Sequence, residues 1–429
     1  MRKGVIPKSL NICLVGTRFQ ILSRKSDHGF LWSIARGLAR RGHQVTVLST
    51  TSSLARSEVV RDGVRTFYLE EGLQFRGKSY FSDLALRKFR ELHKENPFHI
   101  LHGLDNSAYK IAKTKDELHL AVAYDVEATQ MSQLFSILGM GQETLTSLLT
   151  TGLAVTYKFV TTFFGRDRKL LETADGIFVT NPQQRLILER YYLYPDFHIY
   201  TVPYGIEIGD LSPKEKSAEL KATLGLPENS HIAVTISDMT ELHELKNILL
   251  SFEKVAIKKP NAYLIVVGNG PLFKQIEFEV LNLALGNRVI LTGAQKSQDI
   301  LDYVLLGDLF INLSSRTTGF EPSMIEAMAQ KKVIIGSEVS PIGHIIDDGV
   351  DGFLLRPADI ESLAQLMLEI FSGTIAVAEI GERARKKVVD LFDTQKMIAS
   401  ILEAYQKILL KTGFYRVPGA QTEASEAPR

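Results

Sequence analysis

The sequence is short of the residue types that mark several classes of protein. Cysteine occurs once, as Cys13 in the apolar run LNICLVG, so an intrachain disulfide is excluded and a buried thiol is expected. The 50 basic residues almost cancel the 49 acidic ones, which argues against a general nucleic-acid binder because such a protein carries a strong basic excess. No Cys/His cluster occurs, and no Asp-x-Asp pair lies in a setting typical of a metal site, so we expect no bound metal.

Long apolar runs are also scarce. Residues 144–164 (TLTSLLTTGLAVTYKFVTTFF) contain one charge, Lys158, and are long enough to span a bilayer, but their hydroxyl side chains make them weakly apolar. We expect a buried helix or one at the rim of a cleft. A spanning helix and a membrane-facing surface, with Arg166 and Arg168 near acidic headgroups, are the alternatives.

The N-terminal residues MRKGVIPKSL are basic and precede only a short apolar run. We therefore expect no signal peptide. The predicted location is cytoplasmic, either free or peripheral at the inner face of the membrane.

The first half of the chain alternates short apolar segments with amphipathic ones. Residues 29–41 (GFLWSIARGLARR) place Phe30, Ile34 and Leu38 on one helical face, and Gly42 follows where helices commonly end. Strands are predicted at 11–16, 44–49, 65–69, 99–102, 120–124 and 176–180. This alternation indicates a parallel sheet covered by helices on both faces.

The second half repeats this pattern. Helices are predicted at 247–259 and 360–371, and strands at 232–236, 262–268, 288–292, 309–312 and 333–336. Residues 203–216 (PYGIEIGDLSPKEK) are rich in Gly, Pro and charge, which predicts a hinge between the halves. The expected fold class is therefore α/β, with two doubly wound sheets that face each other across a cleft and bind ligands beyond the carboxyl ends of their strands.

One segment of the second half carries a chemical signal. Residues 310–336, FINLSSRTTGFEPSMIEAMAQKKVIIG, read as a strand, a glycine-containing loop, a helix and a second strand. A helix N-terminus offers unpaired N–H groups and about half a unit of positive charge, which suits a phosphate. Glu326, early in this helix, can accept hydrogen bonds from a ribose. The segment therefore predicts a nucleoside-diphosphate site.

The same segment resembles the donor-binding signature of the family 4 glycosyltransferases, E-G-F-G-x-x-x-x-E-A-M-A. The residues that match it are Gly319, Phe320, Glu326, Ala327, Met328 and Ala329. Further blocks resemble the family in the same order along the chain: LARRGHQVTVLS, LLETADGIFVTNPQQRLIL, VPYGIEIGDLSP, AYLIVVGNGP with NRVILTG, VSPIGHIIDDGVDGFLLRPAD and FDTQKMIASILEAYQKIL. The resemblance implies a GT-B fold, in which two Rossmann-like domains face each other across a cleft.

The resemblance also implies a division of the chain. Residues 1–205 would form an N-terminal acceptor-binding domain, and residues 206–390 a C-terminal nucleotide-sugar-binding domain. Residues 391–411 would form a closing helix that packs back onto the N-terminal domain. Residues 412–429 are short of apolar side chains, and we expect them to be disordered.

The activity that the resemblance implies is that of a retaining, metal-independent hexosyltransferase. Such an enzyme would move a sugar from a nucleoside-diphosphate sugar to a saccharide or lipid-linked acceptor, in polysaccharide or glycolipid biosynthesis, with no cofactor. Closure of the hinge would exclude water. Two alternatives stay open: a catalytically altered, non-enzymatic relative that binds or regulates a partner, and an epimerase or phosphorylase on the same fold.

Most candidate ligand-binding residues lie in the C-terminal half. By the resemblance, Lys246, placed just before a predicted helix, would contact the donor phosphates. Gly268 and Gly293, together with Gly16 in the first half, end strands and would let the backbone approach a ligand, unless they only form tight turns. The other donor-binding candidates belong to the loop and first turn of the helix that carries the signature: Thr318, Gly319, Phe320, Ser323, Met324, Ile325 and Glu326.

Two donor-side positions depart from the family pattern. Thr318 stands where the glutamate that contacts the transferred sugar is usual, and Glu321 is the carboxylate that could replace it as a catalytic group. The arginine that usually precedes the phosphate-binding lysine is also missing. Asp238 lies in its neighbourhood and would repel a phosphate, and Arg18 or Arg316 could compensate.

The acceptor side has two candidates. The first loop lacks the family's pair of glycines, and His28 within it could be a general base or an acceptor contact. Tyr124 and Asp125 stand where many relatives have His-Asp. We therefore expect no imidazole chemistry at Tyr124, and we expect the Asp125 carboxylate, at the end of a strand, to contact an acceptor hydroxyl.

Overall fold

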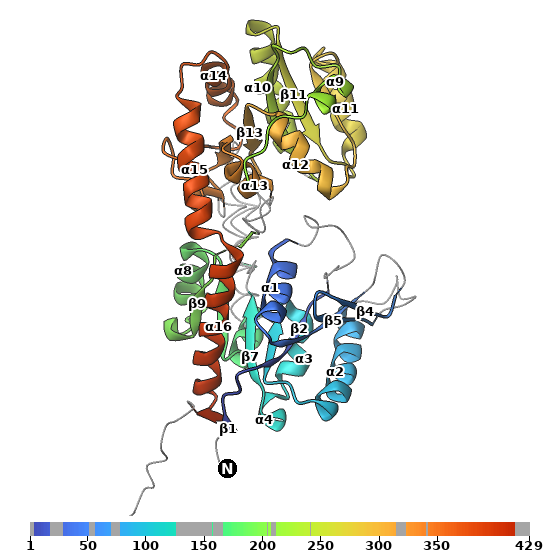
Figure 1. The fold of residues 1–429 in the computed structure, drawn as a ribbon, viewed down its shortest axis with the longest axis vertical. Helices are drawn as coiled ribbons and strands as arrows, with labels where there is room; N and C mark the ends of the chain where they lie inside the picture. The colour runs from blue at the N-terminus through green and yellow to red at the C-terminus, as the bar shows by residue number, and fades with distance from the viewer. Residues whose placement is uncertain are drawn as a thin grey trace, which may run out of the picture.

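The computed structural model describes residues 4–17, 29–50, 56–69, 78–125, 157, 166–203, 205–206, 212–240, 242–314, 323–339 and 342–416 of the 429-residue chain. These residues form two α/β domains that lie one above the other along the longest axis of the molecule (Figure 1). Each domain has its own sheet, packed against helices on both faces, which confirms the predicted fold class.

The N-terminal sheet has eight strands in the order β4-β5-β3-β2-β6-β7-β8-β9, all parallel except for the antiparallel pair β4 and β5 at one edge. The strands are β2 (Asn11–Val15), β3 (Gln44–Ser49), β4 (Glu58–Arg61), β5 (Val64–Tyr68), β6 (Ile100–Gly103), β7 (Ala121–Asp125), β8 (Gly176–Val179) and β9 (Ile199–Thr201). The helices of this domain are α1 (Gly29–Arg40), α2 (Lys78–Glu95), η1 (Asn106–Ala108), α3 (Tyr109–Ala112), α4 (Lys115–Leu118), α7 (Arg166–Thr173), α8 (Pro182–Tyr191) and η2 (Asp196–His198). Cys13 is fully buried in the central strand β2, as expected.

The C-terminal sheet has six parallel strands in the order β12-β11-β10-β13-β14-β15. They are β10 (His231–Ile236), β11 (Ala262–Val267), β12 (Val289–Leu291), β13 (Leu309–Asn312), β14 (Val333–Ser337) and β15 (Phe353–Leu355). The helices are α9 (Ala218–Thr223), α10 (Leu242–Lys258), α11 (Phe273–Asn282), α12 (Ser297–Leu306), α13 (Ser323–Ala329), η4 (Ile342–His344), α14 (Ile360–Phe371) and α15 (Val377–Leu391).

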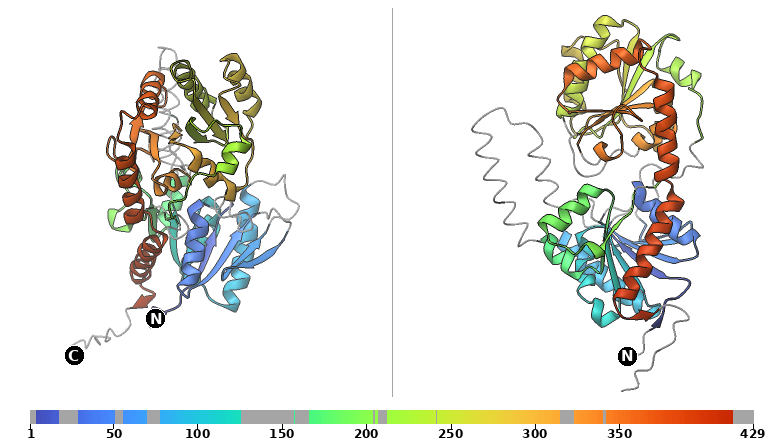
Figure 2. Two further views of the ribbon diagram at one scale, coloured as in Figure 1. Left: turned by 45° about the horizontal axis from the view of Figure 1, so that its top comes forward. Right: turned by 90° about the vertical axis from the view of Figure 1, so that its left-hand side faces the viewer.

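After α15 has covered the C-terminal domain, the chain crosses back and runs as α16 (Thr394–Lys411) along the N-terminal sheet (Figure 2). Its apolar face, which includes Ile398, Ile401 and Ile408, is buried in the N-terminal core. Two glycines make room for it, because a Cβ on Gly37 or Gly176 would lie 2.4 Å from the side chain of Ile398 or Ile408, respectively. The last helix of the chain is thus a structural part of the first domain.

Two segments cross between the domains and are bonded to each other. The N–H of Ile206 donates to the carbonyl of Phe392 at 2.8 Å, and the carbonyl of Ile206 accepts from the N–H of Thr394 at 3.1 Å. Gly205 packs against the start of α16, where a Cβ would lie 2.9 Å from Cα of Thr394. Ile206 falls in the segment predicted to be the hinge, of which residues 204 and 207–211 lie outside the described residues.

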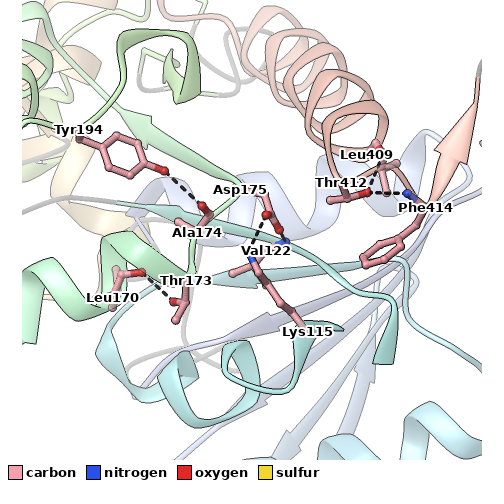
Figure 3. A network of polar contacts seen from close by, with 10 residues as sticks. All are labelled: Lys115, Val122, Leu170, Thr173, Ala174, Asp175, Tyr194, Leu409, Thr412 and Phe414. Atoms are coloured by element: carbon pink, nitrogen blue, oxygen red, sulfur yellow. Dashed lines mark hydrogen bonds and ion pairs between the residues drawn. The ribbon is translucent and has the colours of Figure 1, made fainter. Parts of the chain in front are cut away.

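The end of the described chain is ordered against the N-terminal domain, contrary to the disorder expected from residue 412. Residues Tyr415–Arg416 form β16, which pairs in parallel with β1 (Gly4–Val5). Just before it, the Thr412 hydroxyl accepts from the N–H of Phe414 (Figure 3), whose ring lies 5.0 Å from that of His119. The disorder was predicted from the scarcity of apolar residues in this segment, but β16 is stabilised by pairing with β1, at the opposite end of the chain. Residues 417–429 lie outside the described part.

The same view shows how the start of β7 is fixed (Figure 3). The carboxylate of Asp175, just before β8, accepts hydrogen bonds from the N–H of Val122 and from Nζ of Lys115, at 2.8 and 2.6 Å. This network holds β7 at its amino end, so the position of its carboxyl end follows from the sheet register.

Residues 144–164, predicted to form a buried or rim helix, lie outside the described residues apart from Tyr157. Among the helices that the structure does describe, none combines the length and apolar character needed to cross a bilayer.

Candidate active site

The strand order places a topological switch point in each domain. In the C-terminal sheet the chain builds outward through β10, β11 and β12 and then returns to β13, on the other side of β10. In the N-terminal sheet it builds through β2 and β3 and later returns to β6, on the other side of β2. Ligands of open α/β sheets bind outside the carboxyl ends of strands at such points.

The loops after β10 and β11 form a compact pair at the C-terminal switch point. Gly268 has φ of 129°, and a Cβ there would lie 2.0 Å from the carbonyl oxygen of Ser237. A Cβ on Gly270 would lie 1.8 Å from the carbonyl oxygen of Asp238. The close approach predicted at Gly268 is thus made by another loop of the protein. Gly293, with φ of 69° and no atom near its missing Cβ, accepts a hydrogen bond at its carbonyl from the N–H of Gly268 at 3.2 Å.

Asp238 is held within its own loop. Its Oδ1 accepts from the N–H and the hydroxyl of Thr240, at 3.2 and 2.9 Å. The neighbouring Ser237 hydroxyl accepts from the N–H of Met239, a buried residue in the left-handed region with φ of 50°. This turn occupies the place where the family's arginine was expected.

Lys246 lies in the second turn of α10, because the helix begins at Leu242, five residues earlier than predicted. Its Nζ is 3.2 Å from Oε1 of Glu279 on α11. The lysine side chain is 41% exposed and the glutamate 17%. The ammonium end of this pair is exposed to solvent, so another anion could reach it.

The first residues of helix α13, predicted to bind the donor, have buried side chains. The side chains of Ser323, Met324 and Ile325 are buried, the last two fully, within the C-terminal core. They can therefore meet a ligand only through backbone groups. Glu326, in the first turn, is half-buried and engaged in a polar contact. The preceding loop, residues 315–322 with Arg316, Thr318, Gly319, Phe320 and Glu321, lies outside the described residues.

Asp105 organises the N-terminal switch point. Its Oδ2 accepts from the N–H and the hydroxyl of Thr17, at 2.8 and 2.5 Å, and its Oδ1 caps helix η1 by accepting from the N–H of Ser107 at 2.8 Å. Gly16, one residue earlier, packs on Leu104, whose Cβ would lie 3.0 Å from a Cβ at the glycine. The loop after β2 is thus tied to the loop after β6. Arg18 and His28 lie outside the described residues.

Tyr124 and Asp125 point in different directions at the end of β7. Tyr124 is buried over Gly103, where a Cβ would lie 2.2 Å from the tyrosine ring, and burial raises the pKa of its hydroxyl far above the usual value. It is therefore part of the core. The Asp125 side chain is 10% exposed, and its Oδ2 lies 3.2 Å from Nε2 of His102 on β6. In Figure 1 the arrow of β7 points towards the C-terminal domain, so Asp125 ends the strand on that side.

Sequence reasoning missed three residues of this region: Asp105, His102 and Tyr405. Asp105 had a local signal, because Asp followed by Asn and Ser after an apolar strand is typical of a helix cap. His102 and Tyr405 had none, since each occupies a core position of an apolar strand or helix.

Among the described residues, no group of three or more His, Cys, Asp or Glu side chains is arranged to hold a metal ion.

Two family models match the chain in succession. The one described as Glycosyl transferase 4-like domain matches residues 30–205, and the one described as Glycosyl transferases group 1 matches residues 216–387. Two parallel-sheet domains, each with a switch point, define the protein as a member of the GT-B fold class. The chain belongs to the group 1 glycosyltransferases of family 4.

Similar proteins agree with this assignment. N-acetyl-alpha-D-glucosaminyl L-malate synthase of Bacillus anthracis is 28% identical over 196 residues, which are 46% of this chain and 50% of that relative. The match thus spans half of that relative's length. O-antigen chain mannosyltransferase C of Escherichia coli is 21% identical over 390 residues, which are 88% of this chain and 93% of that one.

Solved structures share the fold at low sequence identity. Sucrose-phosphate synthase of Thermosynechococcus elongatus superimposes with a TM-score of 0.76 at 17% identity, covering 94% of this chain and all (100%) of the other. Anabaena Alr3699/HepE, in complex with UDP and glucose, has a TM-score of 0.69 at 16% identity, covering 92% of this chain and 99% of its own.

Proposed function

We propose that the protein is a glycosyltransferase that moves a hexose from a nucleoside-diphosphate sugar to a saccharide or lipid-linked acceptor, with retention of configuration and without a metal or cofactor. The observation that carries this proposal is the match of both halves of the chain, in order, to the two domain models of one transferase family. The names of relatives support the acceptor classes: an O-antigen chain mannosyltransferase and a galactosyltransferase acting on GlcNAc-diphosphoundecaprenol, both of Escherichia coli.

The C-terminal domain would hold the donor at its switch point. Glu326 would accept hydrogen bonds from the ribose, and Lys246 would leave Glu279 to meet the diphosphate. Thr318 and Glu321 would lie beside the transferred sugar, with the glutamate supplying the carboxylate that the threonine lacks. Uridine nucleotides are the first donors to test, because the HepE structures contain UDP, UDP-glucose or UDP with glucose.

The N-terminal domain would bind the acceptor. The Asp125 carboxylate would accept a hydrogen bond from an acceptor hydroxyl beyond the end of β7, with the Gly16 and His28 loop nearby. A cytoplasmic location, with peripheral contact at the inner face of the membrane, would bring a lipid-linked acceptor within reach. The undecaprenol-linked substrate in the name of one relative supports this part of the proposal.

Nucleotide binding is the first test. Calorimetry and thermal shift would be run with UDP, GDP, ADP and their common sugar conjugates on the wild type, Glu326→Ala and Lys246→Ala. A ligand at 100 times its Kd should stabilise the fold by about 2.7 kcal/mol. Lys254→Ala is the matched control, because Lys254 is a half-exposed lysine on the same helix that pairs with Glu361. Stabilisation by one nucleotide that only the two site variants weaken supports the donor site.

Turnover separates the remaining alternatives. The nucleotide conjugate that binds would be incubated with and without saccharide and lipid-linked acceptors, and the products analysed for anomeric configuration. Transfer with retention supports the proposal, and transfer with inversion contradicts the retaining mechanism. Donor conversion without acceptor indicates an epimerase, a requirement for phosphate indicates a phosphorylase, and binding without any turnover indicates a non-enzymatic relative.

A further inference from the structure

A chain of polar side chains inside the N-terminal core is not explained by packing alone. His102 lies in the middle of the sheet on β6 and is fully buried. Burying a polar ring costs free energy unless its nitrogens are hydrogen-bonded. Both ring nitrogens face polar atoms that come from other elements, one from α16 and one from β7.

The distances place the imidazole of His102 between the hydroxyl of Tyr405 and the carboxylate of Asp125. Nδ1 of His102 is 2.6 Å from the hydroxyl of Tyr405, and Nε2 is 3.2 Å from Oδ2 of Asp125. Nε2 and Oδ2 are both buried, and neither has a hydrogen-bond partner among the described residues, so their 3.2 Å contact is close but is not aligned as a hydrogen bond. The ring of Phe178 on β8 lies 5.1 Å from the imidazole and 5.8 Å from the Tyr405 ring, and it closes the arrangement from the side.

The positions of the protons follow from the two residues at the ends of this arrangement, Asp125 and Tyr405. A carboxylate can only accept, so a proton on Nε2 is what makes its 3.2 Å approach to Oδ2 of Asp125 favourable. In a neutral imidazole Nδ1 is then an acceptor, and the Tyr405 hydroxyl must donate to it. Burial raises the pKa of this hydroxyl well above its ordinary value, so it keeps its proton. The Tyr405 hydrogen bond then donates towards His102, and a small rotation of the imidazole or the carboxylate would let Nε2–H donate to Oδ2 in the same direction, so that the two bonds would strengthen each other.

We propose that His102 and Tyr405 are positioning residues that fix Oδ2 of Asp125 and turn Oδ1 towards a hydroxyl of the acceptor. This inference rests on the proposed function, which makes Asp125 an acceptor contact. It adds that the orientation of this carboxylate depends on the last helix of the chain. A carboxylate with one oxygen beside a buried donor has fewer accessible rotamers, so less freedom is lost when the acceptor binds.

The first experiment does not depend on turnover. Protein labelled with ¹⁵N-histidine would be studied by long-range ¹H–¹⁵N NMR, and the His102 signals would be assigned by their loss in His102→Gln. We expect a neutral ring protonated at Nε2, whose Nδ1 shift moves in Tyr405→Phe and whose Nε2 shift moves in Asp125→Asn. A ring protonated at Nδ1 would overturn the proposal, because Nε2 would then have no proton to give to Asp125.

The second experiment uses two near-isosteres. The side-chain nitrogen of glutamine can take the place of Nε2, whereas that of asparagine can reach only the place of Nδ1. With UDP-glucose as donor and octyl glycosides as acceptors, we expect His102→Asn and Tyr405→Phe to raise the acceptor KM about tenfold, equivalent to about 1.4 kcal/mol. His102→Gln should stay within about twofold of wild type, and the donor KM should not move in any of them.

Two controls separate positioning from general damage. Tyr303→Phe removes a hydroxyl from a buried tyrosine of the C-terminal domain and should leave both KM values unchanged. In an Asp125→Asn background, His102→Asn should add no further loss. Equal losses in His102→Gln and His102→Asn, or losses that persist without Asp125, would show a merely structural role. If the wild type transfers no sugar from any nucleotide sugar that binds to any of the saccharide and lipid-linked acceptors, the proposed function fails, and the NMR result alone decides whether Nε2 of His102 carries the proton that faces Asp125.

Discussion

The hydroxyl of Tyr405 lies 2.6 Å from Nδ1 of His102, although 303 residues separate the two in the sequence. Tyr405 belongs to the closing helix α16, and His102 to a central strand of the first domain. This pair brings the last helix into direct contact with β6, the strand beside β7, which ends at Asp125. The N-terminal domain therefore depends on residues from both ends of the chain.

Loss of this hydrogen bond should destabilise the N-terminal domain. Tyr405→Phe leaves a buried imidazole nitrogen without a donor, at a cost of about 1–3 kcal/mol. Urea denaturation followed by near-UV circular dichroism would measure the free energy of unfolding. Tyr303→Phe, whose hydroxyl belongs to the other domain, should change it by less than about 0.5 kcal/mol. Equal free energies of unfolding for Tyr405→Phe and Tyr303→Phe would show that the hydrogen bond between Tyr405 and His102 contributes little to stability.

Two glycines at the ends of C-terminal strands should differ sharply in their tolerance of alanine. Gly268→Ala combines an unfavourable φ of 129° with a Cβ 2.0 Å from a carbonyl oxygen, and should cost about 2–5 kcal/mol. Gly293→Ala meets open space at φ of 69° and should cost only about 1–2 kcal/mol. Differential scanning calorimetry would compare them. A smaller loss at Gly268 would mean that the two loops separate readily.

The carboxylate of Asp105 should be needed for the order of the loop after β2. Asp105→Ala removes two hydrogen bonds to Thr17 and the cap of η1, so we expect a loss of about 2–3 kcal/mol. Hydrogen exchange of the Thr17 amide should also become faster. Asp83→Ala is the control, since Asp83 is exposed and forms a surface ion pair with Lys110. Unchanged exchange at Thr17 would argue against this anchor.

Lys332 should make the stability of the C-terminal domain depend on alkaline pH. Its Nζ donates to the carbonyls of Leu305 and Gly307 at the end of α12. Burial, with a smaller effect of Lys216, lowers its pKa from 10.5 to about 8. Between these two values the unfolded chain binds more protons than the folded one, so the contribution of Lys332 to stability rises with pH.

The measurement for Lys332 compares the wild type with Lys332→Met over this pH range. The difference in unfolding free energy, wild type minus variant, should be constant below pH 8 and should rise by up to about 3 kcal/mol by pH 10.5. Subtracting the variant removes the titration of tyrosines, which is common to both proteins. A difference that falls with rising pH would show that the folded state favours the charged amine.

Much of the fold could be predicted because its information is local. Buried parallel strands such as β11 are continuous apolar runs, and α1 shows a helical period and ends before Gly42, which has φ of 85°. Predicted strand ends differ from the observed ones by about one residue. The start of α10 was placed five residues late because residues 242–246 lack a clear apolar period on their own. The order of β16 depends on β1, at the other end of the chain.

The candidate site was less predictable than the fold. The sequence indicates which residues follow strands, and it correctly places Gly16, Asp125 and Gly268 at the carboxyl ends of β2, β7 and β11. It does not indicate what each side chain touches. The carbonyl of Ser237 fills the space beside Gly268, and Glu279 is the observed partner of Lys246. Such contacts join segments that are distant in sequence, and no local periodicity encodes them.

The paired backbone bonds of Ile206 limit how the two domains can move. One residue holds both hydrogen bonds of the crossing point, one through its N–H and one through its carbonyl. The bonds join the two segments that cross between the domains, so a movement that separates these segments would break them, whereas a turn about an axis through Ile206 would keep them. Any opening or closing of this molecule should therefore be a rigid-body rotation of one domain about the crossing point, described by a single angle.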